Sequence, residues 1–444
     1  MIIYSGYLLI VFVGILVNYF GWKRSRDKWN FRIGAGVPAF LCAVLLWNVT
    51  DPEYLQADFI KSYYPSGRLV VENPAGLYTS QDDTRCFYFG NLPLLAYVFT
   101  PLAYMSVDQA RYSFLFLGLL SLPVTVFLLF RLSEATPAGK AVLVGLIAVN
   151  GPLFYSIRMG NSTHFVLLLL ALMFLAIKSG KHLSAGFAWG YIGLLKPPLF
   201  LLGLPLLLRK KWRILAGAAI LVAAVTAVSV MVFGVDLHIE YCNECILPLA
   251  DRPHTAFNAQ SIDGFIARLM TGADATHWHP ASLGPNFVFW RQVSAIFLLM
   301  TAVIILWPRG ERVEPGLLML ELSIALCLSI LISPISWTHY YLLLLLPLTL
   351  LLRFHNTTSR TLSRDVAVAG RFTLLPGQIF ALIVAGVLLI GPPVMIRLAL
   401  LQPTHPVLAA LSSRILVSHY FLGGLILYLG FLLIRQRVAK EARA

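Results

Sequence analysis

Long apolar runs recur along almost the whole chain, and they constrain its fold more than any other feature. The first runs from Ile2 to Phe20, and comparable runs follow as far as the C-terminal end. Of the 444 residues, 58% are hydrophobic and only 12% are charged. About 20 apolar residues cross a bilayer as a helix, and so many runs exceed what one soluble core can bury. The sequence therefore predicts an all-α polytopic membrane protein.

Two further expectations concern a signal peptide and a nucleic-acid partner. No basic region precedes the first apolar run and no small-residue cleavage site follows it, which favours a retained helix over a signal peptide. The net charge is +14, but the basic residues cluster in short loops between apolar runs. The positive-inside rule and anionic membrane lipids explain such clusters. We therefore expect membrane lipids, and no nucleic acid, as partners.

The basic clusters also set the topology, because they mark cytoplasmic ends. They are "KRSRDK" (23–28), "RKKWR" (209–213), "PRGER" (308–312), the arginines between 353 and 371, and "RQRVAK" (435–440). Parity then predicts spans near 2–20, 33–48, 213–234, 289–307, 316–332, 338–352, 374–395 and 414–434, with long outer loops at 49–88 and 235–288. Connections of that length are usually functional.

The region from 88 to 208 needs a different arrangement. "LLKPPLF" (194–200) divides its apolar run into two short arms, since consecutive prolines interrupt the helical hydrogen bonds. A hairpin there keeps the basic residues on both sides of it cytoplasmic and places Lys196 at an outer bend. Likewise 88–107, with Pro93 and Pro101, is expected to form short or partly interfacial elements. The prediction is one integral domain, 1–444, of about 11 to 13 transmembrane or re-entrant helices.

This topology brings the unusual polar residues to the outer face. They are Asp58, Lys61, Arg68, "GNSTH" (160–164), Lys196, "NAQSIDGFIAR" (258–268) and "SWTHYY" (336–341). Ionisable groups at membrane depth are costly and indicate a functional site by default, usually paired or facing a cavity. A carboxylate, a lysine, a histidine and an arginine at a membrane-edge pocket suit a lipid-phosphate substrate. The cations hold phosphate, and the carboxylate accepts a proton from an attacking hydroxyl.

Each residue also has a purely structural alternative. Asp58 can be a solvated helix-end carboxylate paired with Lys61 or Arg68, and Lys196 can extend to the membrane interface. His339 can be a hydrogen-bonded core histidine, and "GNSTH" can simply open the next helix. The residues Asn258, Gln260 and Arg268 can fold the outer loop on itself.

Five cysteines are too few for a disulfide scaffold. Cys42 and Cys327 lie in apolar runs and are expected to be inert packing residues. Cys86 with Cys242 or Cys245 is compatible with a disulfide at an oxidising outer face. "CNEC" (242–245) has no second pair or histidine partner at zinc-ligand spacing, so no metal site is expected.

Several segments together resemble glycosyltransferase family 87, the GT-C type enzymes that use polyprenyl-phosphate mannose. In order, they are the aspartate of "QADFIKSYYPSGR" (56–68), "FYFGNLPLLAYVFTPLAY" (87–104), "GNSTHFVLLLLAL" (160–172), "AGFAWGYIGLLKPPLFLL" (185–202), "NAQSIDGFIARL" (258–269) and "SPISWTHYYLLLLLP" (333–347). The resemblance runs from about Asp58 to Pro347. Each segment is loose by itself, and the order is what gives the resemblance its specificity.

The resemblance implies an inverting, metal-independent hexosyltransferase that needs no cofactor. It would move mannose or another hexose from a polyprenyl-phosphate donor to a hydroxyl of a lipid-linked or cell-envelope glycan. The family's active site lies on the extracytoplasmic face of the inner membrane. By position, Asp58 resembles the general base and Lys196 and His339 resemble donor-phosphate contacts. The further candidates for substrate binding are Arg268, Asn258, Gln260, Asn161 and His164, then Lys61, Arg68 and Tyr64.

The sequence departs from the family pattern in three places. Gly160-Asn161 stands where the family has glycine-glutamine, with Ser162, Thr163 and His164 where an asparagine is usual. "FYFGNLP" lacks the commoner tyrosine-proline pair, and the N-terminal helix and basic loop at 1–33 are additional. These departures leave the sugar and the acceptor more open than the reaction class.

Two other classes fit part of the pattern. A transporter or flippase for lipid-linked saccharides would line a passage with charges at mid-membrane and at both ends, whereas here the polar residues fall mainly at outer ends. A ligase or polymerase acting on a lipid-diphosphate-linked chain shares the phosphate chemistry, and only the family resemblance separates it from the transferase.

Overall fold

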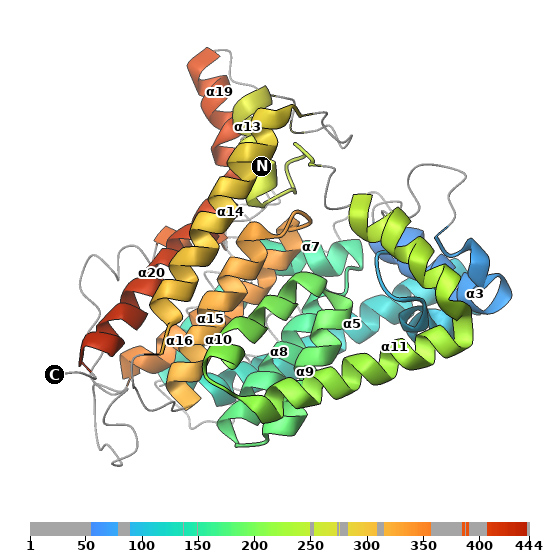
Figure 1. Cartoon of the computed structure of the whole chain (residues 1–444), viewed down its shortest axis with the longest axis horizontal. Helices are drawn as coiled ribbons and strands as arrows, with labels where there is room; N and C mark the ends of the chain where they lie inside the picture. The colour runs from blue at the N-terminus through green and yellow to red at the C-terminus, as the bar shows by residue number, and fades with distance from the viewer. Residues whose placement is uncertain are drawn as a thin grey trace.

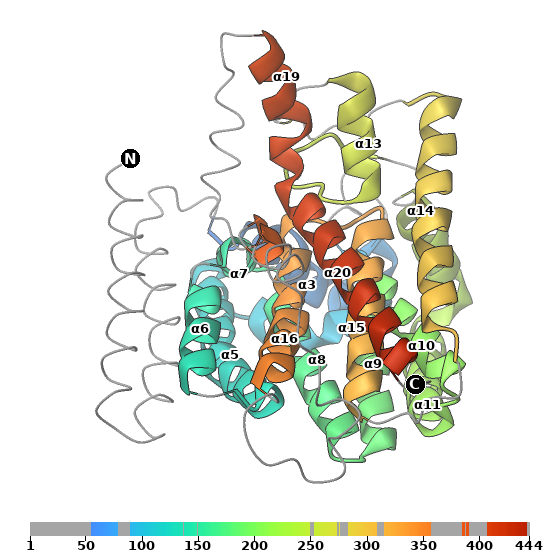
Figure 2. The same ribbon diagram turned by 90° about the vertical axis from the view of Figure 1, so that its left-hand side faces the viewer.

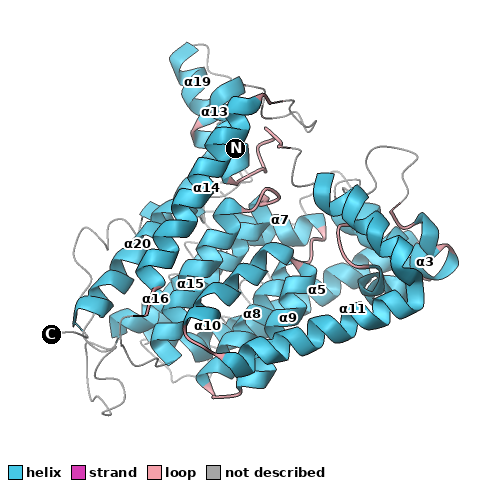
Figure 3. Cartoon of the chain, viewed as in Figure 1, coloured by secondary structure: helices cyan, strands magenta, loops and turns pink. Residues whose placement is uncertain are grey.

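The computed structural model describes residues 55–78, 89–135, 137–148, 150–248, 253–272, 275, 283–308, 315–356, 384–386, 388–389 and 406–441. The helices predicted at 2–20 and 33–48, and most of the span predicted at 374–395, lie outside these residues. Within them the chain is helical and contains no strand, and Ala259 and Trp337 form an isolated antiparallel bridge (Figure 3).

The helices follow one another along the chain as Figure 1 labels them. The first half contains η2 (Phe59–Tyr63), α3 (Tyr64–Glu72), η3 (Pro74–Gly76), η4 (Pro93–Phe99), α4 (Thr100–Ala103), α5 (Val107–Ser133), α6 (Pro137–Ala148), α7 (Gly151–Met159), α8 (Thr163–Lys178), α9 (His182–Leu195), η5 (Pro197–Leu202) and α10 (Gly203–Leu208). The second half contains α11 (Trp212–Glu240), η6 (Tyr241–Ile246), α13 (Ile262–Thr271), α14 (Pro285–Leu306), α15 (Pro315–Ile332), η7 (Thr338–Leu344), α16 (Leu345–Asn356), α19 (Pro406–Arg414), η9 (Leu416–Ser418) and α20 (His419–Glu441).

Five stretches of the described chain are long and apolar enough to cross a membrane. They are Val107–Ser133, Trp212–Ile246, Pro285–Leu306, Pro315–Ile332 and Ala409–Lys440, and the bent pair formed by Val142–Ala148 and Gly151–Met159 gives a sixth if it counts as one span. Shorter apolar helices accompany them. These observations confirm the predicted all-α, multi-pass membrane class.

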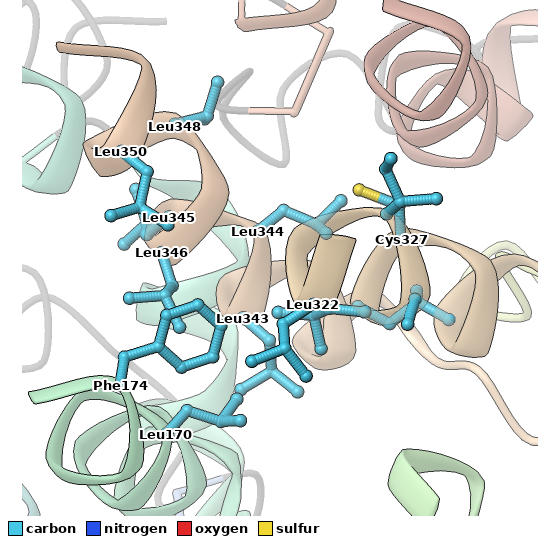
Figure 4. Packing of buried hydrophobic residues seen from close by; sticks show 14 of the residues in the cluster. Leu170, Phe174, Leu322, Cys327, Leu343, Leu344, Leu345, Leu346, Leu348 and Leu350 are labelled. Atoms are coloured by element: carbon cyan, nitrogen blue, oxygen red, sulfur yellow. The ribbon is translucent and has the colours of Figure 1, made fainter. Parts of the chain in front are cut away.

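α15 is the central helix of the bundle. Every residue from Leu317 to Leu331 is buried, as expected for a helix that is apolar on all sides. Figure 4 shows how Leu322 and Cys327 of α15 face leucines of η7 and α16, with Leu170 and Phe174 of α8 beside them. By contrast, α11 and α14 are largely exposed in the structure, which gives them apolar surfaces suited to lipid.

One buried carboxylate organises the part of the bundle where α10, α15 and α20 meet. Glu321 receives two hydrogen bonds from the Arg209 guanidinium and one, of 2.8 Å, from Nε of Arg435. All three side chains are almost completely buried. Removing one partner of such a group leaves an uncompensated buried charge, so the three residues fasten the helices together.

The closest helix pair is α9 with α11, and glycine makes it possible. Gly186 and Gly190 are spaced four apart on α9 and face Gly217 and Ala218 of α11. A Cβ atom at Gly186 would overlap the carbonyl oxygen of Ile214 and lie 2.9 Å from the Cα atom of Gly217. Small residues at this spacing allow helix backbones to approach closely in membranes.

The hairpin predicted at "LLKPPLF" is present. α9 ends at Leu195, η5 starts at Pro197, and the chain turns at Lys196, whose φ and ψ are −139° and 83°. The two arms pack together: Nε1 of Trp189 in the first arm donates a 3.1 Å hydrogen bond to the carbonyl oxygen of Leu199 in the second. The segment predicted to be short or interfacial at 88–107 likewise forms the short helices η4 and α4.

The two predicted outer loops are more helical than the sequence indicated. The first contains η2 and α3. In the second, the expected helix end near residue 234 is a kink, since Gly234 has a φ of 78° and α11 continues to Glu240. His238 stabilises the kink through hydrogen bonds of 2.7 Å to the Gly234 carbonyl and 2.8 Å to the Ser229 hydroxyl. Turn residues therefore mark a bend here and not a loop.

Figures 1 and 2 show how these elements are distributed. α13 and α19 project from the end of the bundle that lies away from the C-terminus. In Figure 2 the C-terminus lies at the same end as the lower ends of α8, α9 and α11.

Replacing Gly186 by alanine should destabilise the protein, because the added methyl group meets backbone atoms that cannot move aside. We expect a loss of about 1–3 kcal/mol, the usual cost of overpacking, seen as a lower melting temperature in detergent. Gly316→Ala is the matched control, since nothing lies within 4 Å of a Cβ atom there. Equal melting temperatures for the two variants would contradict the close packing of α9 and α11.

Candidate active site

Asp58 lies at the start of η2 in a segment fixed by its neighbour Gln56. Gln56 is buried and has a φ of 60°, which is uncommon for a residue other than glycine. Its backbone N–H donates a 2.6 Å hydrogen bond to the carbonyl oxygen of Arg158, and its side-chain amide donates to that of Ile157. Both acceptors are at the C-terminal end of α7, where helical carbonyls have no partner in their own helix. Gln56 therefore attaches the Asp58 segment to α7.

Gly160 lets the next segment approach Asp58 from the other side. It ends α7 with a φ of 68°, a left-handed conformation that glycine adopts without strain. A Cβ atom here would lie 2.6 Å from Oε1 of Gln56 and 2.8 Å from Cβ of Phe59. The turn therefore packs directly on the Asp58 segment, and it presents Asn161 to the carboxylate.

Asn161 connects Asp58 to Lys196. Its Nδ2 donates a 2.9 Å hydrogen bond to Oδ2 of Asp58, and its Oδ1 accepts a 3.3 Å hydrogen bond from Nζ of Lys196. Thr163 donates to the same Oδ1 through its hydroxyl, at 2.7 Å, and its backbone N–H, at 3.2 Å. Three donors around Oδ1 fix the orientation of the amide, so its N–H group must point at the carboxylate.

Lys196 is buried at the turn between α9 and η5, and its ammonium lies 4.3 Å from the centre of the Tyr340 ring. Burial lowers the pKa of Lys196 to about 8, and the nearby charge of Asp58 opposes that shift. Burial also raises the pKa of Asp58 above its ordinary value, against the Asn161 hydrogen bond and the charges of Lys196 and Lys61. Each group thus stabilises the charged form of the other.

Two histidines, His339 and His164, lie close to these residues. His339 belongs to η7, stacks on Tyr155 with ring centres 6.4 Å apart, and lies within electrostatic range of Lys196 and His164. Nδ1 of His164 lies 3.1 Å from the hydroxyl oxygen of Ser156. We call Asp58, Asn161, Lys196 and His339 the Asp58 cluster. Four segments that are far apart in the sequence supply it.

The three weaker candidates behave differently from one another. Lys61 is exposed and lies within electrostatic range of Asp58. Tyr64 donates a 2.9 Å hydrogen bond to the carbonyl oxygen of Met105. Arg68 forms an exposed ion pair of 2.9 Å with Glu72, four residues along α3. Only Lys61 is therefore placed beside the cluster.

Arg268 and Gln260 are engaged elsewhere. Arg268 is fully buried and donates hydrogen bonds to the hydroxyl of Ser418 and to the carbonyls of Thr255 and Ala256. Gln260, also fully buried, bonds through its side chain to the backbones of Phe257, Val417 and Phe421. Both side chains hold the outer loop and the start of α20 together, which is the structural alternative that the sequence left open. Neither side chain is therefore proposed as a substrate contact.

Asn258 lies near the Asp58 cluster. Several aromatic side chains that the sequence did not single out also lie around the cluster. The Asn258 amide is close to the Tyr155 hydroxyl, which is in turn within electrostatic range of Asp58. The hydroxyl of Tyr63 is 3.2 Å from that of Ser162. Tyr155 has no charge and no motif around it, whereas Tyr340 stands in "SWTHYY" directly after His339, a signal that could have found it.

The cysteines of the predicted outer loops differ in their bonding state. Cys245 is buried and disulfide-bonded, whereas Cys242 is exposed and has a free thiol. Cys86 lies outside the described residues. No group of three or more histidine, cysteine, aspartate or glutamate side chains is placed to hold a metal ion in the part of the chain that the structure describes.

The arrangement suits transfer to a hydroxyl. A carboxylate whose pKa is raised is a better proton acceptor than a free one, and a buried ammonium beside it attracts an anion. Both lie at the junction of η2, α7, α9 and η7, where the backbone is irregular. Such backbone at membrane depth is tolerated where it lines a cavity or is buried in protein.

Comparison with known proteins places this geometry in a family. The model of glycosyltransferase family 87 matches residues 89–334, which include Asn161, Lys196 and Asn258 but neither Asp58 nor His339. A search of curated proteins finds no match. Among solved structures, the chain is similar to ArnT from Cupriavidus metallidurans bound to undecaprenyl phosphate, with 15% identity, coverage of 91% of this chain and 77% of that one, and a TM-score of 0.43. The family match covers more than half of the chain, which therefore belongs to glycosyltransferase family 87 and is a membrane glycosyltransferase of the GT-C type.

Proposed function

We propose that the protein transfers a hexose, most simply mannose, from a polyprenyl-phosphate donor to an acceptor hydroxyl, with inversion and with Asp58 as the general base. The acceptor is a lipid-linked or cell-envelope glycan, and the reaction takes place at the outer face of the cytoplasmic membrane. The observation that carries this proposal is the link from the Asp58 carboxylate through Asn161 to the buried Lys196 ammonium.

In the proposed reaction Asp58 takes the proton of the acceptor hydroxyl while that oxygen forms a bond to the sugar carbon. A free aspartate, with a pKa of about 3.9, is a weak base, so proton transfer must accompany attack. Burial strengthens the base by raising its pKa. Asn161 occupies one oxygen of the carboxylate and leaves the other for the acceptor.

The leaving group is the polyprenyl phosphate, which departs with the electron pair of the broken sugar–oxygen bond. Lys196 is the group that would meet its charge, because its ammonium lies within electrostatic range of the Asp58 carboxylate. His339 lies within electrostatic range of Lys196 and would contribute a hydrogen bond from its neutral ring. Positive charge fixed where negative charge develops lowers the barrier without reorganisation of solvent. The proposal uses no metal and no cofactor, since the phosphate is the leaving group and the Lys196 ammonium supplies the positive charge.

The arrangement of buried charge favours an enzyme over a transporter. A further buried charged group, Glu321 with two arginines, is bonded to them through both carboxylate oxygens. It lies about 16 Å along α15 from Ile332, the end that leads to His339. A passage for a charged saccharide would need accessible polar groups there, and this triad is closed on itself.

Asp58→Asn should reduce sugar transfer by at least about 100-fold, the lower end of what a general base contributes. The amide still accepts the Asn161 hydrogen bond, so the variant should fold normally. Donor consumption by purified protein, with polyprenyl-phosphate mannose as substrate, is the measurement. Asp108→Asn, at an exposed ion pair of α5, is the control and should keep full activity. Turnover near the wild-type rate in Asp58→Asn would exclude the base assignment.

The rate should depend on pH as a bell. Transfer needs Asp58 ionised, so kcat/KM should rise with pH through a pKa above the ordinary aspartate value. It also needs Lys196 protonated, so kcat/KM should fall as pH passes about 8. Lys196→Arg keeps its proton far beyond that pH, and its remaining activity should lose the alkaline limb. An alkaline limb that stays at the same pH in this variant would assign it to another group.

Gln56 is expected to act as a positioning residue for Asp58. It touches neither proposed substrate, but its hydrogen bonds to the end of α7 set where the carboxylate lies. A base that moves by about 1 Å can lose as much as about 100-fold in rate. The left-handed backbone of Gln56 is a strain that these hydrogen bonds maintain.

Gln56→Met keeps the side-chain volume and removes the hydrogen bond to the Ile157 carbonyl. We expect kcat to fall by at least about tenfold while KM for the donor changes by less than about threefold. Gln109→Met, which alters a helix cap of α5, should leave both constants unchanged. A parallel rise in KM without loss of kcat would show that Gln56 shapes donor binding and does not position the base.

A further inference from the structure

The segments around Asn258 and Thr338 are joined beside the Asp58 cluster. The N–H of Thr338 donates a 2.9 Å hydrogen bond to the carbonyl of Asn258, and the N–H of Gln260 donates a 2.8 Å hydrogen bond to that of Ser336. Ala259 and Trp337 form the bridge between them. The backbone polar groups of this junction therefore satisfy one another.

The side chains of the same junction do not. The hydroxyls of Ser333, Ser336 and Thr338 and Nδ1 of His339 are buried and have no hydrogen-bond partner in the described structure. The Asn258 amide is buried beside them and meets the Tyr155 hydroxyl. These five side chains are all exposed by 5% or less. We call them the polar junction. Their unpaired atoms are a concentrated exception to the rule that buried polar groups are bonded.

Unpaired buried atoms also occur elsewhere in the described chain, at Gln56 and His164 for example, but four of them are gathered at this junction. In the same loop, the side chains of Gln260 and Arg268 are bonded through every functional group described for them. A buried polar group without a partner is unfavourable, so the side chains of the polar junction together destabilise the unliganded protein. A ligand that offers both donors and acceptors at close spacing would remove that cost, and the hydroxyls of a sugar do so.

The polar junction adjoins the proposed chemistry. His339 belongs to both the junction and the Asp58 cluster, and Tyr155 stacks on His339 while lying close to the Asn258 amide. Tyr155 is itself within electrostatic range of Asp58. Tyr155 and Trp337, which neighbour the junction, are partly exposed. A sugar whose reacting carbon faces Asp58 would place its remaining hydroxyls against the junction.

We propose that Asn258, Ser336 and Thr338 form the subsite that recognises the hydroxyls of the transferred sugar and selects the donor. The proposal rests on the sugar transfer proposed above. Neutral groups of this kind discriminate strongly, because a donor that lacks the matching hydroxyl leaves them unpaired inside the protein. The subsite therefore determines which sugar is used, whereas the Asp58 cluster determines that transfer takes place.

The test uses the purified full-length protein with polyprenyl-phosphate mannose and a series of its monodeoxy analogues. Thr338→Val removes one hydroxyl and keeps the side-chain shape, and Ser336→Ala is a milder second variant. Thr349→Val is the matched control, because that buried hydroxyl already donates to the Leu345 carbonyl within its own helix. The readout is the ratio of kcat/KM for the parent donor to that for each analogue, which a general loss of stability does not change.

We expect the wild-type protein to prefer the parent donor by at least tenfold over one analogue. Thr338→Val or Ser336→Ala should remove that preference by slowing only the parent donor, and Thr349→Val should keep it. If both variants slow all donors equally, or change none, the junction is a hydrated structural cluster and the inference is wrong while the transferase proposal stands. If the wild-type protein consumes none of these donors and also none carrying other hexoses, the proposed function itself fails, and the subsite with it.

Discussion

The amide of Asn161, held between the partly buried Asp58 carboxylate and the buried Lys196 ammonium, is the interaction on which the arrangement of this site depends. Asp58 and Lys196 are 138 positions apart in the sequence, and neither charge is stable alone at its depth. Three backbone features bring them to one amide: the left-handed Gln56, the glycine that ends α7, and the turn before Pro197. Of the three, the left-handed Gln56 is the strained feature, and its hydrogen bonds to the end of α7 maintain it.

Contacts elsewhere in the bundle hold the helices that carry these residues. The glycine-mediated contact of α9 with α11 fixes the arm that carries Lys196. Glu321 fastens α15 to α10 and α20, because both oxygens of its carboxylate accept hydrogen bonds from arginines of those helices. Buried charge is therefore used in two ways: closed at Glu321, where it holds helices, and open at Asp58, where one carboxylate oxygen is free for a proton.

Apolar runs sufficed to predict the helical membrane class, and charge parity with proline placement predicted the hairpin at Lys196 and the convergence of Asp58, Asn161, Lys196, His164 and His339. These depend on rules that act locally or on whole spans. The pairing of Arg268 with Ser418 could not be predicted, because the two residues are 150 positions apart and neither segment contains a pattern that indicates the other as its partner. The helical extension beyond Gly234 was missed for a related reason: a glycine permits both a kink and an end, and His238 decides between them.

The same reasoning explains why specificity is harder to find in a sequence than chemistry. An aspartate or lysine at the edge of an apolar run is conspicuous, since burying its charge requires a reason. Ser336 and Thr338 are common neutral residues, and they become candidates for a sugar subsite only because the folded chain buries their hydroxyls without partners. If charged groups set the reaction class and neutral hydroxyl and amide groups set the sugar preference, as proposed above, members of one family can keep the first and vary the second. The departure of this chain at Gly160-Asn161 lies among the charged groups, since Asn161 donates a hydrogen bond to the Asp58 carboxylate.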